Sequence, residues 1–364
     1  MKKVLIFIED YKRFMKNYII HLSSSLNEQK IDFLIYGSDE LKEDFEDKII
    51  VQNDLEYFYE NNDPRLYEGF LNYVNENKIE NIFIARLRKP EFFYSEILIR
   101  KNKKINIIFS IMAFELYSKS AARRNIMFKI SRLNQIKKII IHSILGKHLS
   151  FPNAISSNNN DTNKYMFLSE PQYEDPKNYH SDDKLNQQKE KFKILYFGNV
   201  FYGKGVDILI NASKYFADNI EITLAGDIKT LNFDYDKKNL EDNNFKFISH
   251  RVNDQEMYKL FKETDIVVLP YRRTYLYGTS GVFQQSLFAN KPVICSNFYP
   301  FDKAIDIFKC GETFISEDPK SLASKVNKMK ESNLTSYCNK MSDFIDNIDD
   351  WDKISKILKK EFTL

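Results

Sequence analysis

The sequence predicts an α/β protein with two doubly wound domains, each built on a parallel sheet. Short apolar runs alternate with stretches of helical character along most of the chain, which is typical of strand–helix–strand units. Residues 265–296 show this unit clearly: an apolar run ends at a proline, a polar turn opens a helical stretch, and a second apolar run follows. A length of 364 residues is sufficient for two such domains.

The first half contains six apolar runs that we expect to be strands. They are Val4–Ile8, Ile31–Tyr36, Ile82–Ala85, Ile105–Ile111, Ile139–His142 and Tyr165–Leu168. The composition turns polar at 156–161, and residues 171–190 hold two prolines, many charges and few apolar side chains. We therefore predict an N-terminal Rossmann-like domain over 1–172 and a linker over 173–190.

The second half repeats this alternation, and we assign residues 191–340 to a second Rossmann-like domain. Its predicted strands are Ile194–Phe197, Ile222–Ala225, Phe245–Ile248, Ile266–Leu269, Val293–Cys295 and Thr313–Ile315. Its predicted helices are Val206–Tyr215, Asp254–Lys262, Val282–Ala289 and Leu322–Met329. Asn253 stands three residues before Glu256, the spacing of an N-terminal cap. One or two helices should close the chain over 340–364, and we expect residues 341–364 to pack back on the first domain.

Composition narrows the class of protein. Cys295, Cys310 and Cys338 form no CxxC pair, which favours reduced thiols in a cytoplasmic protein. Glu9 and Asp10 follow the first apolar run too soon for a signal peptide, and no apolar run is long enough to span a bilayer. We therefore expect a cytoplasmic protein.

Glycines cluster where the first strand of the second domain ends. The strand leads into Gly198-Asn199-Val200-Phe201-Tyr202-Gly203-Lys204-Gly205. Gly198 lets the chain turn out of the sheet, and Gly203 and Gly205 allow the backbone to approach a ligand closely. Lys204 supplies a point charge suited to phosphate. The alternative interpretation is a glycine-rich turn with a solvated lysine.

A second polar turn precedes the predicted helix that begins at Val282. It reads Gly278-Thr279-Ser280-Gly281, and Arg272 and Arg273 stand at the neighbouring strand end. The unpaired N–H groups and the positive dipole end of a helix start form a seat for phosphate. Because parallel strands end at one edge of a sheet, the two turns would hold one diphosphate between them. The alternative is an ordinary serine cap beside a surface arginine pair.

Taken in order, these segments resemble the C-terminal half of retaining GT-B fold glycosyltransferases, the nucleotide-sugar enzymes of the family 4-like, group 1 type. The resemblance covers roughly residues 191–330. Besides the Gly–Lys-Gly opening, it comprises Leu224-Ala225-Gly226-Asp227, Asp265–Pro270, Lys291–Ile294, Gly311 and Asp318-Pro319. The resemblance implies a GT-B fold, in which two Rossmann-like doubly wound domains face a central cleft, and it assigns a phosphate role to Lys204.

The chain departs from the family pattern at several positions. The family commonly has an arginine after the first glycine, where this chain has Asn199. It often has two glutamates with seven residues between them, where this chain has Tyr277 and Gln285. Gln285 can still hydrogen-bond ribose hydroxyls, because an amide both donates and accepts. The tract is similar to a branch in which the start of a Ser-Gly helix binds phosphate, here Ser280, Gly281 and Val282.

The candidate catalytic residues lie in the first domain. The glycine pair that often follows the first strand of the family is absent, and Asp10 stands there instead. The family histidine after the Ile105–Ile111 strand is also absent, and Glu115 is the charged side chain at that strand end. For both carboxylates the alternative is an ordinary surface position. His142 is the best-placed histidine, although strand-end histidines are commonly just packed.

Charge is strongly segregated along the chain. Residues 81–160 carry fifteen basic and three acidic side chains, and residues 116–160 contain no acid. Basic and apolar residues mingle over 116–138, which suits a basic amphipathic helix on an anionic membrane surface. The alternative is a solvated helix whose apolar stripe packs on the sheet. No nucleic-acid-binding motif is present.

The sequence therefore predicts a glycosyltransferase, and more narrowly a hexosyltransferase. The expected donor is a nucleotide sugar, and the expected acceptor is a saccharide or a lipid-linked saccharide. The reaction would belong to the biosynthesis of a cell-surface polysaccharide or glycolipid. The resemblance implies retention of the anomeric configuration. No Asp-x-Asp stands at a strand end of the second half, so we expect no metal and no cofactor. Two alternatives remain open: a GT-B nucleotide-sugar epimerase, and a non-catalytic GT-B-like partner subunit. Peripheral contact with the inner face of the membrane is expected through residues 116–138.

Overall fold

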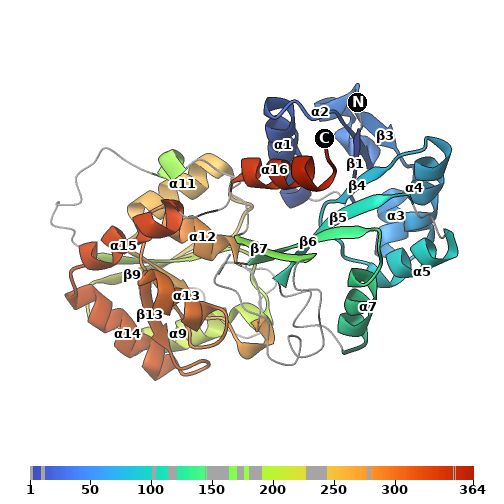
Figure 1. Ribbon diagram of the computed structural model, residues 1–364. Helices are drawn as coiled ribbons and strands as arrows, with labels where there is room; N and C mark the ends of the chain where they lie inside the picture. Colours follow the sequence, from blue (N-terminus) through green and yellow to red (C-terminus); the bar gives the residue numbers. More distant parts are fainter. Residues whose placement is uncertain are drawn as a thin grey trace. The chain divides into compact units, whose positions relative to one another are not determined.

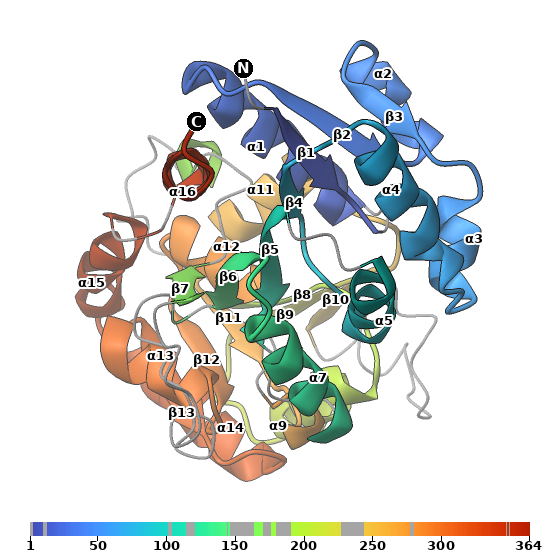
Figure 2. The same ribbon diagram turned by 45° about the vertical axis from the view of Figure 1, so that its right-hand side comes forward.

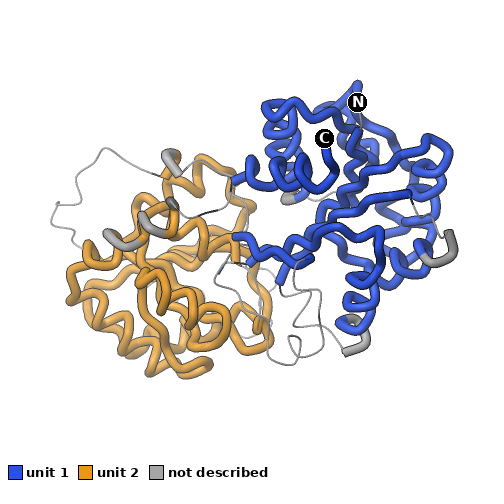
Figure 3. Tube along the Cα trace, viewed as in Figure 1, with its two compact units in different colours: residues 1–173, 348–364 blue, residues 174–347 orange. Residues whose placement is uncertain are grey.

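The chain divides into two compact units in the computed structural model (Figure 3). Unit 1 comprises residues 1–173 and 348–364, and unit 2 comprises residues 174–347. The structure describes residues 3–9, 13–100, 104–113, 121–143, 145, 164–169, 176–179, 191–226, 244–276, 280–346, 348 and 350–364. Each unit is a parallel sheet flanked by helices, so the predicted α/β class is confirmed (Figure 1).

The sheet of unit 1 has seven strands in the order β3-β2-β1-β4-β5-β6-β7. They are β1 (Val4–Phe7), β2 (Phe33–Gly37), β3 (Ile49–Val51), β4 (Asn81–Ile84), β5 (Asn106–Met112), β6 (Ile136–Ser143) and β7 (Tyr165–Ser169). Val4 pairs with Phe33 on one side and with Asn81 on the other. The strand order therefore reverses around β1, and the loops that follow β1 and β4 diverge at the carboxyl edge, where α/β sheets bind ligands.

Helices cover both faces of this sheet (Figure 1 and Figure 2). They are α1 (Arg13–Glu28), α2 (Lys42–Phe45), α3 (Leu55–Glu60), α4 (Arg65–Glu76), α5 (Pro90–Arg100), α7 (Ala121–Ser131) and α16 (Trp351–Glu361). Ile6 points into a core with α1 and α16, whereas the next residue, Phe7, stacks on Phe70 of α4 at 4.2 Å between ring centroids. Burial of successive side chains on opposite faces explains why β1 reads as a continuous apolar run.

The sheet of unit 2 has six strands in the order β10-β9-β8-β11-β12-β13. They are β8 (Phe192–Phe197), β9 (Ile220–Ala225), β10 (Phe245–Ile248), β11 (Ile266–Leu269), β12 (Val293–Ser296) and β13 (Gly311–Phe314). The helices are α9 (Val206–Ser213), α11 (Asp254–Glu263), α12 (Gly281–Phe288), α13 (Phe301–Phe308), α14 (Pro319–Glu331) and α15 (Thr335–Asp346). Since β8 lies between β9 and β11, the loops after β8 and β11 are neighbours.

Most predicted elements are present within a few residues of their expected bounds, and the cap at Asn253 is confirmed because its side chain accepts from the amide of Glu256. Two elements were missed. β3 is a half-buried edge strand of three residues, and α13 has only eight residues. β3 is too short for a periodic pattern to stand out from the flanking sequence. Length does not explain why α13 was missed, because α9 and α12 are equally short and were predicted.

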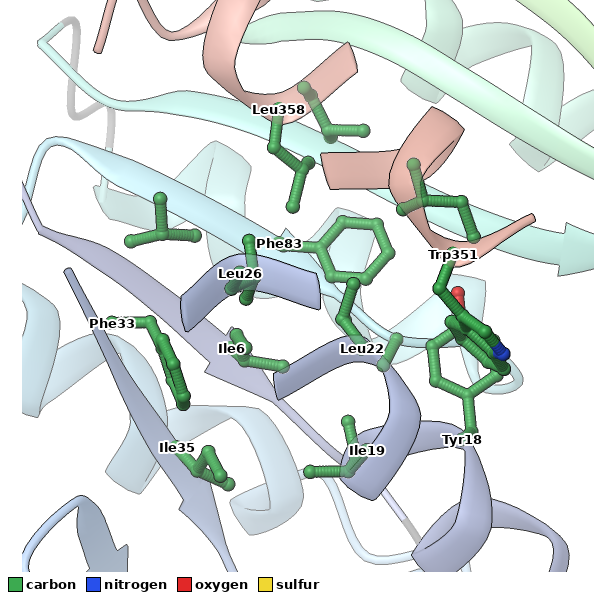
Figure 4. Close-up of a cluster of buried hydrophobic side chains, with 14 of the residues drawn as sticks. Ile6, Tyr18, Ile19, Leu22, Leu26, Phe33, Ile35, Phe83, Trp351 and Leu358 are labelled. Carbon is green, nitrogen blue, oxygen red and sulfur yellow. The ribbon is translucent and has the colours of Figure 1, made fainter. Parts of the chain in front are cut away.

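The last helix packs on unit 1, as Figure 4 shows. Trp351 of α16 meets Tyr18 of α1 edge-on, with 4.7 Å between ring centroids. Ser25 donates to the Asp352 carboxylate at 2.7 Å. α15, in contrast, packs on α12 and α13 of unit 2. The chain thus returns to unit 1 only after α15 has ended.

Candidate functional site

Glycines shape the loop that follows β8 in unit 2. Gly198 has φ of +114°, and a Cβ added to Gly226 would stand 2.0 Å from the carbonyl oxygen of Gly198. Gly205 has φ of +64°, and a Cβ there would stand 2.0 Å from the carbonyl oxygen of Pro270. Both contacts are far shorter than any side chain allows. Gly226 therefore lets the end of β9 approach Gly198, and Gly205 lets the β8 loop lie directly against the loop after β11.

The two predicted phosphate seats meet in the folded chain. An added Cβ on Gly198 would lie 3.4 Å from Cγ2 of Val282, in the first turn of α12. Lys204 lies over the ring of Tyr271, and the Tyr271 hydroxyl is hydrogen-bonded to Oγ of Ser280 at 3.0 Å. The β8 loop and the start of α12 are therefore parts of one site at the carboxyl edge of the unit 2 sheet.

Lys204 is a buried cation held by aromatic rings. Its exposed fraction is 8%, and Nζ lies 3.8 Å from the ring centroid of Tyr271 and 4.2 Å from that of Tyr275. Among the residues that the structure describes, no carboxylate pairs with it. Burial lowers the pKa of Lys204 to about 7, because the ammonium loses its hydration and gains no anion in return. The alternative interpretation, a glycine-rich turn with a solvated lysine, is thus excluded.

The start of α12 presents two backbone amides. Ser280 is the N-cap, and its Oγ accepts from the amide of Phe283 at 3.2 Å. That leaves the amides of Gly281 and Val282 without an acceptor in the described part of the chain. A Cβ added to Gly281 would meet nothing within 4 Å, so the space in front of this turn is open. Ser280 therefore serves as a cap, and the adjoining amides remain available to an anion.

Arg272 has other partners than the phosphate seat we predicted for it. Its guanidinium makes a two-pronged ion pair with the Asp207 carboxylate, and Nη1 donates to the carbonyl oxygen of Tyr202 at 2.7 Å. Nε lies 3.8 Å from the Glu317 carboxylate. Hydrogen bonds to Asp207 raise the already high pKa of Arg272 against the opposing effect of burial. Arg272 thus ties the β8 loop to the start of α9, while its neighbour Arg273 is solvent-exposed, and the phosphate contact of this pair stays a prediction.

The other predicted donor-site residues lie nearby on the same elements. Gln285, one turn into α12, is half-buried and places Nε2 at 3.3 Å from Sδ of Met257. The amide of Arg272 donates to the carbonyl oxygen of Gly203, so this glycine helps to join the two loops. Asn199, where the family has arginine, is exposed. Tyr277 lies outside the described residues.

Both catalytic candidates, Asp10 and Glu115, also lie outside the described residues. The sequence analysis did not single out Glu9, the residue before Asp10. Glu9 follows β1 and is 1% exposed. Its carboxylate accepts from the hydroxyl of Tyr67 and, at 3.0 Å, from the amide of Arg88. An acidic residue directly after a buried strand was the available signal. His142 is buried, and its Nδ1 lies 2.9 Å from the carbonyl oxygen of Ser169.

The basic tract contains α7 in its described part. Met127 and Ile130 are buried, whereas Lys129 and Arg132 are exposed. The apolar stripe thus packs inward, as the alternative interpretation expected, and charged side chains remain at the surface. Among the described residues, no helix combines the length and apolar character needed to cross a bilayer. Within the same ranges, no three His, Cys, Asp or Glu side chains gather closely enough to hold a metal ion.

Comparison with known proteins indicates the protein family to which the domain carrying this site is similar. Residues 178–351, which form nearly all of unit 2, match the family model of "Glycosyl transferases group 1". No curated protein matches the chain significantly. The whole chain is similar to Anabaena Alr3699/HepE in complex with UDP, with 14% identity, full coverage of both chains and a TM-score of 0.71. It is also similar to a glycosyltransferase from Rickettsia africae, with 15% identity, 99% and 98% coverage and a TM-score of 0.69.

A third similar structure is sucrose-phosphate synthase from Thermosynechococcus elongatus, with 12% identity, 100% and 98% coverage and a TM-score of 0.69. These likenesses show that both units together form a GT-B fold. The family match in unit 2, together with the GT-B fold of the chain, confirms the prediction of a GT-B glycosyltransferase enzyme, and retention of configuration stays a prediction.

Proposed function

We propose that this enzyme transfers a hexose from a nucleotide-sugar donor, whose diphosphate binds unit 2 between Lys204 and the amides of Gly281 and Val282. The observation that carries the proposal is the buried Lys204 ammonium, which has no carboxylate partner in the described chain and stands in the same site as two unpaired amides. A buried charge is tolerated when an opposite charge compensates it. A diphosphate supplies that charge.

The same groups would assist the chemistry. As the bond between the sugar and the diphosphate breaks, negative charge grows on the leaving phosphate. Lys204 and the helix amides already point at this charge, so they stabilise it without reorganising. They would take the role that a divalent metal has in other transferases. We therefore propose that the enzyme needs no metal or other cofactor and that its donor affinity survives EDTA.

The proposal is tested by the donor affinity of Lys204→Met. UDP and UDP-glucose are the first probes, because the Anabaena neighbour was solved with each. Loss of a charge-assisted bond should weaken nucleotide binding by about 1.5–3 kcal/mol. The matched control is Lys214→Met, which removes an exposed lysine just after α9. If calorimetry with UDP, ADP and GDP found equal affinities for native protein and Lys204→Met, the proposed donor site would be wrong.

For the acceptor we propose a saccharide or lipid-linked saccharide used in cell-surface polysaccharide or glycolipid biosynthesis, with retention of configuration by family resemblance. One similar structure is WaaG, a glycosyltransferase of lipopolysaccharide biosynthesis, with a TM-score of 0.59 and 13% identity. The exposed cations of α7 support peripheral binding at the inner face of an anionic membrane. Sedimentation with anionic but not with neutral liposomes, lost when Lys129 and Arg132 become glutamate, is the expected result.

Two alternative functions differ from the proposed one in what the protein would produce from the donor. A GT-B epimerase would convert the donor with no acceptor present, and a non-catalytic subunit would bind nucleotide without turnover. Gln285 and Asn199, which stand where the family has charged residues, are the observations that favour the second. Detection of a glycoside product by mass spectrometry, with donor and membrane extract supplied, decides among the three.

A further inference from the structure

Two exposed aromatic side chains stand beside Lys204 in the β8 loop. Phe201 is 47% exposed and Tyr202 is 67% exposed, although large aromatic rings are usually covered. Both lie at the carboxyl edge of the unit 2 sheet, because the loop leaves the end of β8. Phe201 lies at the margin of the Lys204 surroundings, with 6.0 Å between Nζ and its ring centroid, whereas the Tyr202 ring lies against Arg272. Exposed aromatic surface next to a ligand site marks a surface that a further part of the ligand covers.

The Tyr202 ring is held in place. The Arg272 guanidinium lies over the ring, with Cζ 4.1 Å from the centroid, and Nη1 of the same side chain donates to the Tyr202 carbonyl oxygen at 2.7 Å. Asp207 in turn fixes the guanidinium through its two-pronged ion pair. A cation thus stacks against the ring while two thirds of the side chain stays exposed, so the ring is a preformed flat surface.

Two carboxylates lie against the Arg272 guanidinium that stacks on this ring. The Glu317 carboxylate, whose side chain is 52% exposed, lies 3.8 Å from Nε of Arg272. The Asp207 side chain is 28% exposed. Ionised carboxylates accept hydrogen bonds from paired hydroxyls, and guanidinium groups donate to them. An aromatic ring flanked by such groups matches a pyranose ring, which has an apolar face of C–H groups and a rim of hydroxyls.

We propose that Phe201 and Tyr202 form a stacking platform for a pyranose ring, with Glu317 and Asp207 hydrogen-bonding its hydroxyls. The ring belongs either to the donor sugar or to the acceptor saccharide. This inference rests on the proposed function, since the platform adjoins the proposed phosphate site. It adds a saccharide subsite to unit 2 that the Lys204 argument does not contain.

The experiment compares native protein with Phe201→Ala, Tyr202→Ala, Tyr202→Phe and the control Tyr215→Ala. Tyr215 is 50% exposed but follows α9, away from the β8 loop. In the donor arm, calorimetry measures the affinity for UDP, UDP-glucose, UDP-galactose, UDP-N-acetylglucosamine, GDP and GDP-mannose. In the acceptor arm, saturation-transfer NMR detects contact with the methyl glycosides of glucose, galactose, mannose and N-acetylglucosamine in the presence of saturating UDP.

The expected result is that the alanine variants bind UDP and GDP within about twofold of native protein and lose saccharide recognition in one arm. If the platform holds the donor sugar, the alanine variants should bind UDP-sugars about three- to tenfold more weakly than native protein does, while their affinity for UDP stays the same. An acceptor platform instead loses the NMR signal of a methyl glycoside. Tyr202→Phe should keep most of either response, because stacking needs the ring and not the hydroxyl. Tyr215→Ala should behave as native.

Three outcomes overturn the platform. In the first, the alanine variants recognise saccharides as well as native protein does in both arms. In the second, the variants lose as much affinity for UDP as for UDP-sugars. In the third, native protein shows neither a higher affinity for any nucleotide sugar than for its nucleotide nor an NMR signal from any methyl glycoside. Failure of the proposed function looks different, because native protein would then bind no nucleoside diphosphate. The acceptor arm, repeated without UDP, would still test the platform in that case.

Discussion

A buried charged side chain stands at the carboxyl edge of each sheet, and the two differ in how their charge is compensated. In unit 1 the Glu9 carboxylate accepts from the Tyr67 hydroxyl and from the amide of Arg88. In unit 2 the Lys204 ammonium contacts the rings of Tyr271 and Tyr275, and the described chain offers it no carboxylate. The fold itself completes the first environment, whereas an external anion is needed to complete the second.

This difference separates a structural charge from a ligand-binding one. Glu9 ties the end of β1 to the loop after β4, so its hydrogen bonds stabilise unit 1. The uncompensated burial of the Lys204 ammonium lowers the stability of unit 2, and in the function proposed above a bound diphosphate would offset that cost. Glu9 and Lys204 are both buried, so burial does not distinguish them. The difference lies in their partners: the chain supplies hydrogen-bond donors to Glu9, and the described residues supply no carboxylate to Lys204.

Placing an anion in the open site should have the largest effect. Gly281→Asp puts a carboxylate at the start of α12, in space that is empty in the structure. It should abolish UDP binding, with a loss of about 100-fold or more from repulsion and occlusion. Ser280→Ala removes the cap and the hydrogen-bond partner of the buried Tyr271 hydroxyl, so it should lower stability by about 2 kcal/mol. It should leave UDP binding nearly intact, because the amides of Gly281 and Val282 remain. Melting temperature and calorimetry on both variants are the measurements. A Gly281→Asp protein with native affinity would refute the site.

Removing the Glu9 carboxylate, which the chain itself hydrogen-bonds, should lower the stability of the protein rather than its affinity for UDP. Glu9→Ala leaves the Tyr67 hydroxyl and the Arg88 amide buried without their acceptor, which should cost about 3 kcal/mol of folding free energy. Glu28→Ala, which removes an exposed carboxylate at the end of α1, should change stability by less than about 0.5 kcal/mol. Urea unfolding measures both. Equal midpoints for the two variants would show that Glu9 does not have the structural role assigned to it.

The two adjacent arginines sharpen the comparison within unit 2. Arg272→Ala removes the partner of Asp207 and of the Tyr202 carbonyl, so we expect a loss of about 2 kcal/mol in stability and weaker UDP binding through a loosened β8 loop. Arg273→Ala should leave both quantities nearly unchanged, since this residue is exposed. The reverse pattern, in which Arg273→Ala alone weakens UDP binding, would restore the original assignment of a phosphate contact to the arginine pair.

The pH dependence of Lys204 should be the smallest effect. Because burial lowers its pKa from 10.5 to about 7, the cost of the uncompensated ammonium is fully present below about pH 7 and disappears as pH approaches 10.5. A bound diphosphate favours the ammonium. UDP affinity should therefore fall by up to about tenfold between pH 7 and pH 8, with proton uptake detectable by calorimetry in buffers of different ionisation enthalpy. Lys204→Met should lack both the slope and the uptake; a Met variant that retained them would assign them to another group.

Much of unit 2 could be predicted because each of its signals is local. Strand runs of four to six apolar residues, the Asn253 cap and the glycines at 198 and 205 all act within a few residues of themselves. The partners of Arg272 could not be predicted in this way. Asp207 is 65 residues away along the chain, and a sequence does not show which of many acids an arginine will meet. The same holds for Glu9, whose hydrogen-bond donors lie 58 and 79 residues downstream.

The sequence by itself determined the α/β class, the order of nearly all strands along the chain and the two loops to which the proposed donor site is assigned. It did so because apolar periodicity, caps and the positive φ of glycine are properties of short segments. Only the tertiary structure decided that Lys204 is buried among tyrosines, that Arg272 belongs to the scaffold, and that Phe201 and Tyr202 remain exposed beside them. Those properties depend on which distant side chains fill the space around a charge or a ring, and burial and compensation exist only once the chain has folded.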